Sequence, residues 1–103
     1  MIRAAIYARV STTGQGQDVG LQLDELRDLA RARGWRVVGE YVDDGVSGSS
    51  RRRPQLDAML DAVRDGQVEV VAFWKLDRLS RDARHALELF DTFRELGVDA
   101  VSP

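Results

Sequence analysis

The chain has 103 residues, 44% of them hydrophobic, which is enough for one domain with a modest core but not for two ordinary domains. It contains no cysteine, which excludes disulfides and thiolate metal sites, and no apolar run approaches the roughly 18 residues of a membrane span. The net charge of −2 creates no overall attraction to a polyanion, so any phosphate binding must be local. The N-terminus lacks the long apolar stretch of a secretory signal, and we expect a cytoplasmic protein that does not interact with membranes.

The first half of the chain predicts two strands with a helix between them. Residues 2–9 are apolar apart from two arginines, as is typical of a central strand. Residues 21–33 have apolar residues at near-helical spacing, and Gly34 provides a C-terminal stop. Residues 35–42 alternate and are rich in β-branched and aromatic residues, which predicts the second strand. The apolar residues of the helix are Leu21, Leu26, Leu29 and Ala30.

The second half continues the alternation. A polar loop leads to Pro54, a favoured first residue for a helix, and Gly66 ends that helix. Residues 68–74 predict a buried third strand. Ser80 is a good N-cap for a third helix that runs to Gly97, and a fourth strand begins in the last residues. The apolar residues along the third helix are Leu87, Phe90, Phe93 and Leu96.

This order of elements predicts an α/β fold of three layers, with a largely parallel sheet of about four strands and helices on both faces. The larger aromatic side chains have core spacing, so we assign them to packing and not to base stacking. They are Trp35, Phe73, Trp74, Phe90 and Phe93. In open parallel sheets, ligands bind beyond the carboxyl ends of the strands, where loops and helix N-termini converge.

Polar residues follow the ends of all three complete strands. They are Tyr7, Arg9 and Ser11 for the first strand, Asp43, Asp44, Ser47 and Arg53 for the second, and Lys75, Asp77, Arg78 and Arg81 for the third. Equal parity puts Tyr7 and Arg9 on one face of the sheet, with Ser11 just past the strand end. Independent loops have no structural reason to concentrate arginine at one edge. A phosphodiester attacked by a serine at that edge would supply such a reason. Fixed guanidinium groups stabilise the charge of that transition state and could replace a divalent metal.

Three segments of the chain carry a more specific signal, namely YARVST at 7–12, DGVSGSSRRRP at 44–54 and KLDRLSR at 75–81. Together, in this order and spacing, they resemble the catalytic domain of the serine recombinases, the resolvase/invertase family, over essentially the whole chain. The resemblance implies DNA strand transfer through a phosphoserine, without ATP, metal or other cofactor. It also implies double-stranded DNA as the partner, with no small-molecule substrate. The full-length protein is expected to be bacterial and to assemble as a homo-dimer to tetramer.

The resemblance also implies roles for individual residues. Ser11 matches the nucleophile that becomes joined to a 5′-phosphate, and Asp77 matches a carboxylate that carries a proton or orients an arginine. The phosphate-gripping arginines correspond to Arg9, Arg53, Arg78 and Arg81. The supporting positions correspond to Tyr7, Gln15, Gln22, Asp44, Ser47 and Lys75.

The family continues with a fifth strand, a long dimerisation helix and a DNA-reading domain, none of which follows Pro103 in this sequence. We therefore expect residues 1–103 to be a truncated catalytic domain. Such a fragment should bind DNA weakly and should not recombine DNA by itself.

Several of these residues also admit ordinary roles. Outside its context, Ser11 would be interpreted as a turn or cap serine. Arg51 and Arg52 are as readily a solvated charge run as a DNA contact. Asp43 and Asp44 are interpreted as turn formers and not as metal ligands, because no third ligand at suitable spacing accompanies them.

Two further alternatives concern single side chains and the function as a whole. His85, the only histidine, could be a general base, but a lone helical histidine is more often at the surface or in packing. Asp77 could form a structural bridge with Arg78 or Arg81. The alternative function is a catalytically silent relative or a nucleotide-binding module, although no GxGxxG or GxxxxGK[ST] stretch is present.

Overall fold

Strands and helices alternate along the computed structural model, which describes residues 1–10, 19–44, 53–74 and 83–103. In chain order, the elements in these ranges are β1 (Arg3–Val10), α1 (Val19–Arg33), β2 (Arg36–Asp44), α2 (Pro54–Arg64), β3 (Val70–Phe73), α4 (Ala83–Glu95) and β4 (Asp99–Val101). The predicted order of elements is therefore confirmed.

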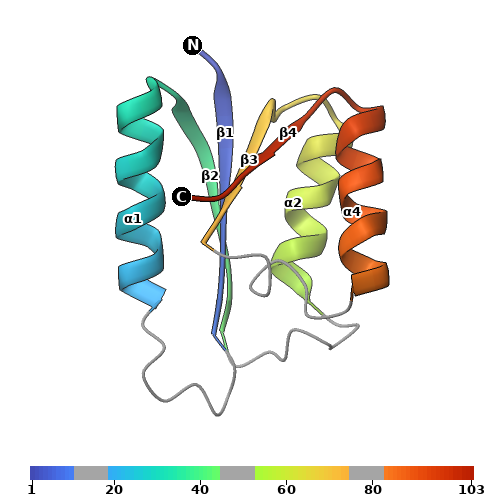
Figure 1. Cartoon of the computed structure of the whole chain (residues 1–103), viewed down its shortest axis with the longest axis horizontal. Coiled ribbons are helices and arrows are strands. Elements are labelled where there is room, and N and C mark those ends of the chain that lie inside the picture. Colours follow the sequence, from blue (N-terminus) through green and yellow to red (C-terminus); the bar gives the residue numbers. More distant parts are fainter. Residues whose placement is uncertain (11–18, 45–52, 75–82) are drawn as a thin grey trace.

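The four strands form one sheet in the order β2-β1-β3-β4, and each neighbouring pair is parallel. Helix α1 covers one face of this sheet, while α2 and α4 lie together on the other (Figure 1). This arrangement confirms the three-layer α/β prediction. Because the strands are parallel, β1, β2 and β3 end at a common edge, which we call the carboxyl edge; their last residues are Val10, Asp44 and Phe73.

Each described helix is followed by a glycine within two residues of its end. Gly34, Gly66 and Gly97 have φ values of 71°, 76° and 71°, in the left-handed region that costs glycine little and other residues much more. After α1, the N–H of Trp35 donates to the carbonyl of Ala30 at 2.9 Å, which is the 6→1 hydrogen bond of a Schellman motif. The helix stops predicted from these glycines are confirmed. None of the described helices is both long and apolar enough to span a bilayer.

The structure corrects the boundaries of the strands. The second strand, predicted over 35–42, runs from Arg36 to Asp44, because the neighbouring β1 pairs with its polar end. The third strand, predicted over 68–74, is shorter. The observed bounds are Val70–Phe73 for β3, Arg3–Val10 in place of 2–9 for β1, and Val19–Arg33 in place of 21–33 for α1. The predicted N-cap Ser80 lies outside the described residues.

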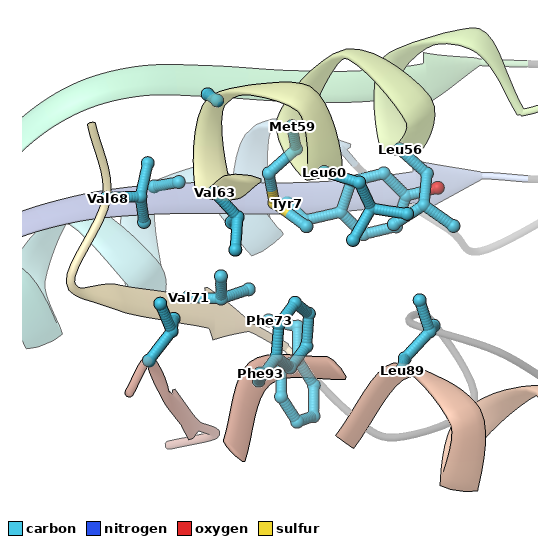
Figure 2. Packing of buried hydrophobic residues seen from close by; sticks show 13 residues of the cluster. Tyr7, Leu56, Met59, Leu60, Val63, Val68, Val71, Phe73, Leu89 and Phe93 are labelled. Carbon is cyan, nitrogen blue, oxygen red and sulfur yellow. The ribbon is translucent and has the colours of Figure 1, made fainter. Parts of the chain in front are cut away.

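The larger hydrophobic cluster fills the space between the sheet and the pair α2 and α4. Tyr7 of β1 and Phe73 of β3 meet there with Phe93 of α4 and with the apolar face of α2 (Figure 2). A smaller cluster on the other face joins Ile6 and Ala72 to α1. The larger cluster includes Leu56, Met59, Leu60, Val63, Val68, Val71 and Leu89. Tyr7 therefore belongs to the main core, although its hydroxyl is polar.

The aromatic residues pack largely as predicted. Phe73 and Phe93 are buried, and Phe90 and Trp35 lie partly buried against the two clusters. Trp74 is also partly buried, and its indole N–H donates to the carboxylate of Glu25 on α1.

Three leucines from the predicted apolar patterns are exposed instead of buried. The face of α1 that meets the sheet carries Gln22, Leu26 and Ala30, four residues apart, which leaves Leu21 exposed. On α4 the buried line is Ala86, Leu89 and Phe93, so Leu87 projects into solvent, as does Leu96 beyond the helix end. The helix period thus selects a polar residue, Gln22, for the buried face.

Candidate active site at the carboxyl edge

Buried polar side chains concentrate at the carboxyl edge. Among the described residues, the buried polar or charged side chains are Arg9, Gln22, Asp43 and Arg53, and each of them is at most 2% exposed. Burying charge is costly unless the group is hydrogen-bonded and paired. Packing alone gives no reason to place two arginines and an aspartate at one end of the sheet, so this edge is the candidate site.

The hydroxyl of Tyr7 connects the carboxylate of Asp43 on β2 with the guanidinium of Arg53 at the N-cap of α2. This hydroxyl donates to Oδ2 of Asp43 at 2.7 Å. The Nε and Nη2 atoms of Arg53 both donate to the same hydroxyl oxygen, at 3.1 and 2.8 Å. The guanidinium carbon of Arg53 lies 5.2 Å from the centre of the Tyr7 ring, within the range of a cation–π contact. One hydroxyl therefore holds a buried carboxylate and a buried guanidinium together.

Asp43 also caps helix α2 from a different element. Arg53 occupies the N-cap position, but its side chain makes no capping hydrogen bond. The N–H groups of Gln55 and Leu56 donate instead to the two carboxylate oxygens of Asp43, at 3.0 and 3.1 Å. A helix start needs such acceptors and favours negative charge. The interpretation of Asp43 as a turn former is therefore wrong, because it is a buried strand residue with three hydrogen-bond donors around it.

The environment of Tyr7 keeps its hydroxyl protonated. Burial raises the pKa of Tyr7 above its ordinary value of 10.0, and the hydrogen bond to Asp43 raises the pKa further. The guanidinium of Arg53 acts in the opposite direction but does not offset the burial. The phenol therefore keeps the proton that it donates to Asp43, while its oxygen accepts from Arg53.

This shift predicts a dependence of stability on alkaline pH. The folded state retains the Tyr7 proton at pH values where the unfolded chain has lost it. The contribution of the protonated Tyr7 hydroxyl to the free energy of unfolding is therefore complete below about pH 10, and it is lost as the pH rises towards the raised pKa. Above pH 10, the free energy of unfolding of the native chain should fall by up to about 1.4 kcal/mol per pH unit more steeply than that of Tyr7→Phe. Urea denaturation at a series of alkaline pH values measures both slopes, and equal slopes would contradict this assignment.

The side-chain amide of Gln22 holds the main chain of Arg9. Its Oε1 accepts from the N–H of Arg9 at 3.3 Å, and its Nε2 donates to the carbonyl of Arg9 at 3.1 Å. The pairing of β1 with β3 stops at Tyr7 and Phe73, two residues before Arg9. The side-chain amide of Gln22 therefore continues the hydrogen bonding of β1 where β3 no longer does so, and it fixes the strand just before Ser11.

Replacing Gln22 with alanine should destabilise the fold. The change removes both hydrogen bonds from the buried main chain of Arg9 and should cost about 1–3 kcal/mol in the free energy of unfolding. Gln67→Ala is the matched control, because Gln67 is exposed and should tolerate the same change. Urea denaturation of the two variants checks this result. Equal stability of Gln22→Ala and Gln67→Ala would show that the amide does not hold the strand.

The structure brings together four of the sequence-predicted site residues, namely Tyr7, Arg9, Gln22 and Arg53. Asp44 is the last residue of β2, and its side chain lies outside the description. The other predicted residues lie outside the described ranges; these are Ser11, Gln15, Ser47, Lys75, Asp77, Arg78 and Arg81, as well as Arg51 and Arg52. Sequence reasoning placed Asp43 at this edge but interpreted it as a turn former, so the role of Asp43 in the site was not predicted. Strand alternation continued beyond Tyr41 would have placed it on the buried face.

Two of the ordinary alternatives concern other groups. His85 is partly buried in the first turn of α4, and the structure does not test it as a general base. In the ranges that the structure describes, no three histidine, cysteine or carboxylate side chains gather as they would to hold a metal ion.

The sequence matches the family model described as "Resolvase, N terminal domain" over residues 4–103. It is 36% identical over 96 residues to the Transposon Tn917 resolvase of Enterococcus faecalis, and 36% identical over 93 residues to the DNA-invertase of Escherichia phage P1. These alignments cover 93% and 90% of this chain but 46% and 44% of the two relatives. The chain thus spans about half the length of the curated relatives that it matches.

Solved structures give the same result. The N-terminal catalytic domain of TP901-1 integrase superimposes with a TM-score of 0.89 at 38% identity, covering 97% of this chain and 75% of that one. The C-terminal catalytic domain of ISC1926 TnpA, an IS607-like serine recombinase, superimposes with a TM-score of 0.89 at 34% identity, covering 98% and 69%. With its parallel sheet, its buried arginines at the carboxyl edge and these matches, the chain belongs to the resolvase N-terminal domain family, that of the serine recombinase catalytic domains.

Proposed function

We propose that this chain is the catalytic domain of a site-specific DNA recombinase that uses Ser11 as its nucleophile. The observation that supports the proposal most directly is the pair of buried arginines, Arg9 and Arg53, at the edge where β1 ends immediately before Ser11. In the proposed step, Oγ of Ser11 bonds to phosphorus and the bond from phosphorus to the 3′-oxygen of DNA breaks. The serine proton passes to a base, and the departing 3′-oxygen gains a proton.

Arginine supplies the stabilisation that the reaction needs. Negative charge builds on the phosphoryl oxygens during the attack, and fixed guanidinium groups in a site shielded from water stabilise that charge. We assign this role to Arg9, Arg53, Arg78 and Arg81. Asp77 carries the proton or orients one of these arginines.

Rejoining of the DNA needs no external energy source. The phosphoserine ester retains the energy of the broken phosphodiester, so a 3′-hydroxyl from another strand attacks the phosphorus and releases Ser11. We assign supporting roles to Tyr7 and Gln22, which hold Arg53 and Arg9 in the described structure. Further support comes from Gln15, Asp44, Ser47 and Lys75.

The proposed partner is double-stranded DNA, as the names of the resolvase and DNA-invertase relatives suggest. Those relatives are about twice as long as this chain, which supports a role for residues 1–103 as one domain of a longer recombinase. We propose that the longer protein acts as a dimer to tetramer on DNA in the bacterial cytoplasm.

The test uses the natural recombinase that contains this chain, together with DNA that carries its recombination site. In EDTA, the protein should become covalently joined to the 5′-phosphate of the cut strand and should leave a free 3′-hydroxyl. Denaturing gels with each DNA end labelled separately detect this product. Cleavage that requires a divalent metal and leaves no protein on the DNA would indicate a nuclease instead. Binding without cleavage would indicate a catalytically silent relative.

A further inference from the structure

We infer that Asp43 is a positioning residue that fixes Arg53 at the site through two separate routes, one along the main chain and one through the Tyr7 hydroxyl. This inference rests on the proposed function only where it gives Arg53 a role towards phosphate. The arrangement itself is present in the described residues. Asp43 lies opposite Arg9 in the pairing of β1 with β2, so it stands at the centre of the candidate site.

The first route fixes the main chain of Arg53. This residue is the N-cap of α2, and its carbonyl accepts the hydrogen bond from the N–H of Asp57 at 3.0 Å. Asp43 holds the N–H groups of Gln55 and Leu56, within the first turn that follows. Because Pro54 restricts the backbone between these points, anchoring the first turn on β2 also sets the position of the Arg53 Cα atom.

The second route fixes the guanidinium. The Tyr7 hydroxyl has one proton, and that proton points towards Asp43. The lone pairs of the oxygen are then directed to the Nε and Nη2 atoms of Arg53. Asp43 therefore sets the orientation of the hydroxyl, and the hydroxyl sets the orientation of the guanidinium above the Tyr7 ring.

A carboxylate suits this position better than any neutral side chain of the same shape. Three donors converge on Asp43, namely the Tyr7 hydroxyl and the N–H groups of Gln55 and Leu56. A carboxylate accepts from all three and has no donor of its own, whereas an asparagine amide must direct its NH₂ group towards one of them. The change Asp43→Asn therefore alters hydrogen bonding while preserving volume.

The expected consequence is a change in chemistry more than in binding. Asp43 and Arg53 are 2% and 1% exposed, and hydrogen bonds in such a water-poor environment reinforce one another. Arg53 is thus ordered before DNA arrives, and a donor that is already oriented contributes to the transition state without reorganisation. Loss of this order should lower the rate of phosphoserine formation and leave DNA affinity nearly unchanged.

The structural test follows the Arg53 Nε–H group by NMR in the 103-residue chain. In the native chain and in Asp57→Asn, this proton should exchange slowly with water. Asp57 is a suitable control because it is an exposed aspartate in the same first turn of α2. In Asp43→Asn and Tyr7→Phe, exchange should be at least about tenfold faster. Tyr7→Phe leaves the Asp43 contacts to α2 in place, so its Leu56 amide should remain protected, and this variant decides the question if Asp43→Asn does not fold.

The functional test measures the single-turnover rate of covalent adduct formation by the natural recombinase. Asp43→Asn and Tyr7→Phe should slow this step by at least about tenfold, with DNA affinity within about twofold of the native value. Asp57→Asn should react at the native rate. Native exchange of the Arg53 proton in Asp43→Asn and Tyr7→Phe, or native adduct rates in both, would overturn the inference. If the native protein forms no adduct while the Arg53 proton responds as expected, the proposed function fails and the positioning role stands.

Discussion

In the natural recombinase that contains this chain, Ser11→Ala is expected to abolish the covalent protein–DNA adduct while leaving DNA binding intact. Alanine lacks the hydroxyl oxygen that forms the ester with phosphorus in the proposed mechanism. Removal of a catalytic nucleophile costs on the order of a millionfold in rate in a serine hydrolase, so the product should fall below detection. Single-turnover reactions with end-labelled DNA measure the adduct, and a gel-shift titration measures binding.

The matched control for this change is Ser102→Ala. Ser102 is exposed near the end of the chain, and its hydroxyl donates to the carbonyl of Trp74. This variant should form the adduct at the native rate. An adduct of normal yield from Ser11→Ala would assign the nucleophile to another residue and would remove the central element of the proposed mechanism.

Arg78→Ala and Arg81→Ala should have the next largest effects. In the proposed mechanism, each change removes a charged donor from the developing phosphoryl charge, and the loss of one well-placed donor costs about 3 kcal/mol or more in the activation free energy. Each variant should therefore form the adduct on the order of a hundredfold more slowly. The effect should fall on the rate at saturating DNA, because the donor contributes most in the transition state.

Arg52→Ala provides the control for these arginine variants. This change also removes one positive charge, but Arg52 belongs to a run of arginines that is as readily explained by solvation as by DNA contact. The rate of adduct formation should therefore change little. The measurement is again the single-turnover rate of adduct formation. If Arg78→Ala or Arg81→Ala cuts DNA at the native rate, the site has been assigned to the wrong segments.

Much of the fold follows from periodicity that is local in the sequence. The apolar run around Ile6 and the glycines that end the helices predict strands and helices in the correct order, because each signal depends on neighbours only a few residues away. The exposure of Leu87 was less predictable. Its neighbours Ala86 and Leu89 define the buried line of α4, and only packing against the sheet selects that line over the adjacent one.

The site was predictable in composition but not in its connections. Tyr7, Arg9 and Arg53 stand at strand and helix ends that the sequence identifies. However, the contact between Tyr7 and Arg53 joins residues 46 positions apart, and it depends on how α2 docks on β1. The role of Gln22 depends likewise on β3 being shorter than β1, which is a property of the sheet and not of the helix that carries Gln22. The position of Asp43 within β2 was not predicted, because pairing with β1 extends β2 through a polar segment that has weak strand propensity.

We expect Ser11 and the arginines of a distant segment, Arg78 and Arg81, to meet at one edge of the sheet. The absence of cysteine allows a direct test, because a pair of introduced cysteines will be the only thiols in the chain. We predict that the shortest bifunctional methanethiosulfonate reagent will join Ser11→Cys to Arg81→Cys within one molecule. It should not join Ser11→Cys to Arg94→Cys, which places the second thiol in the last turn of α4. Failure of the first pair to cross-link, under conditions where both thiols react with a monofunctional reagent, would contradict the account.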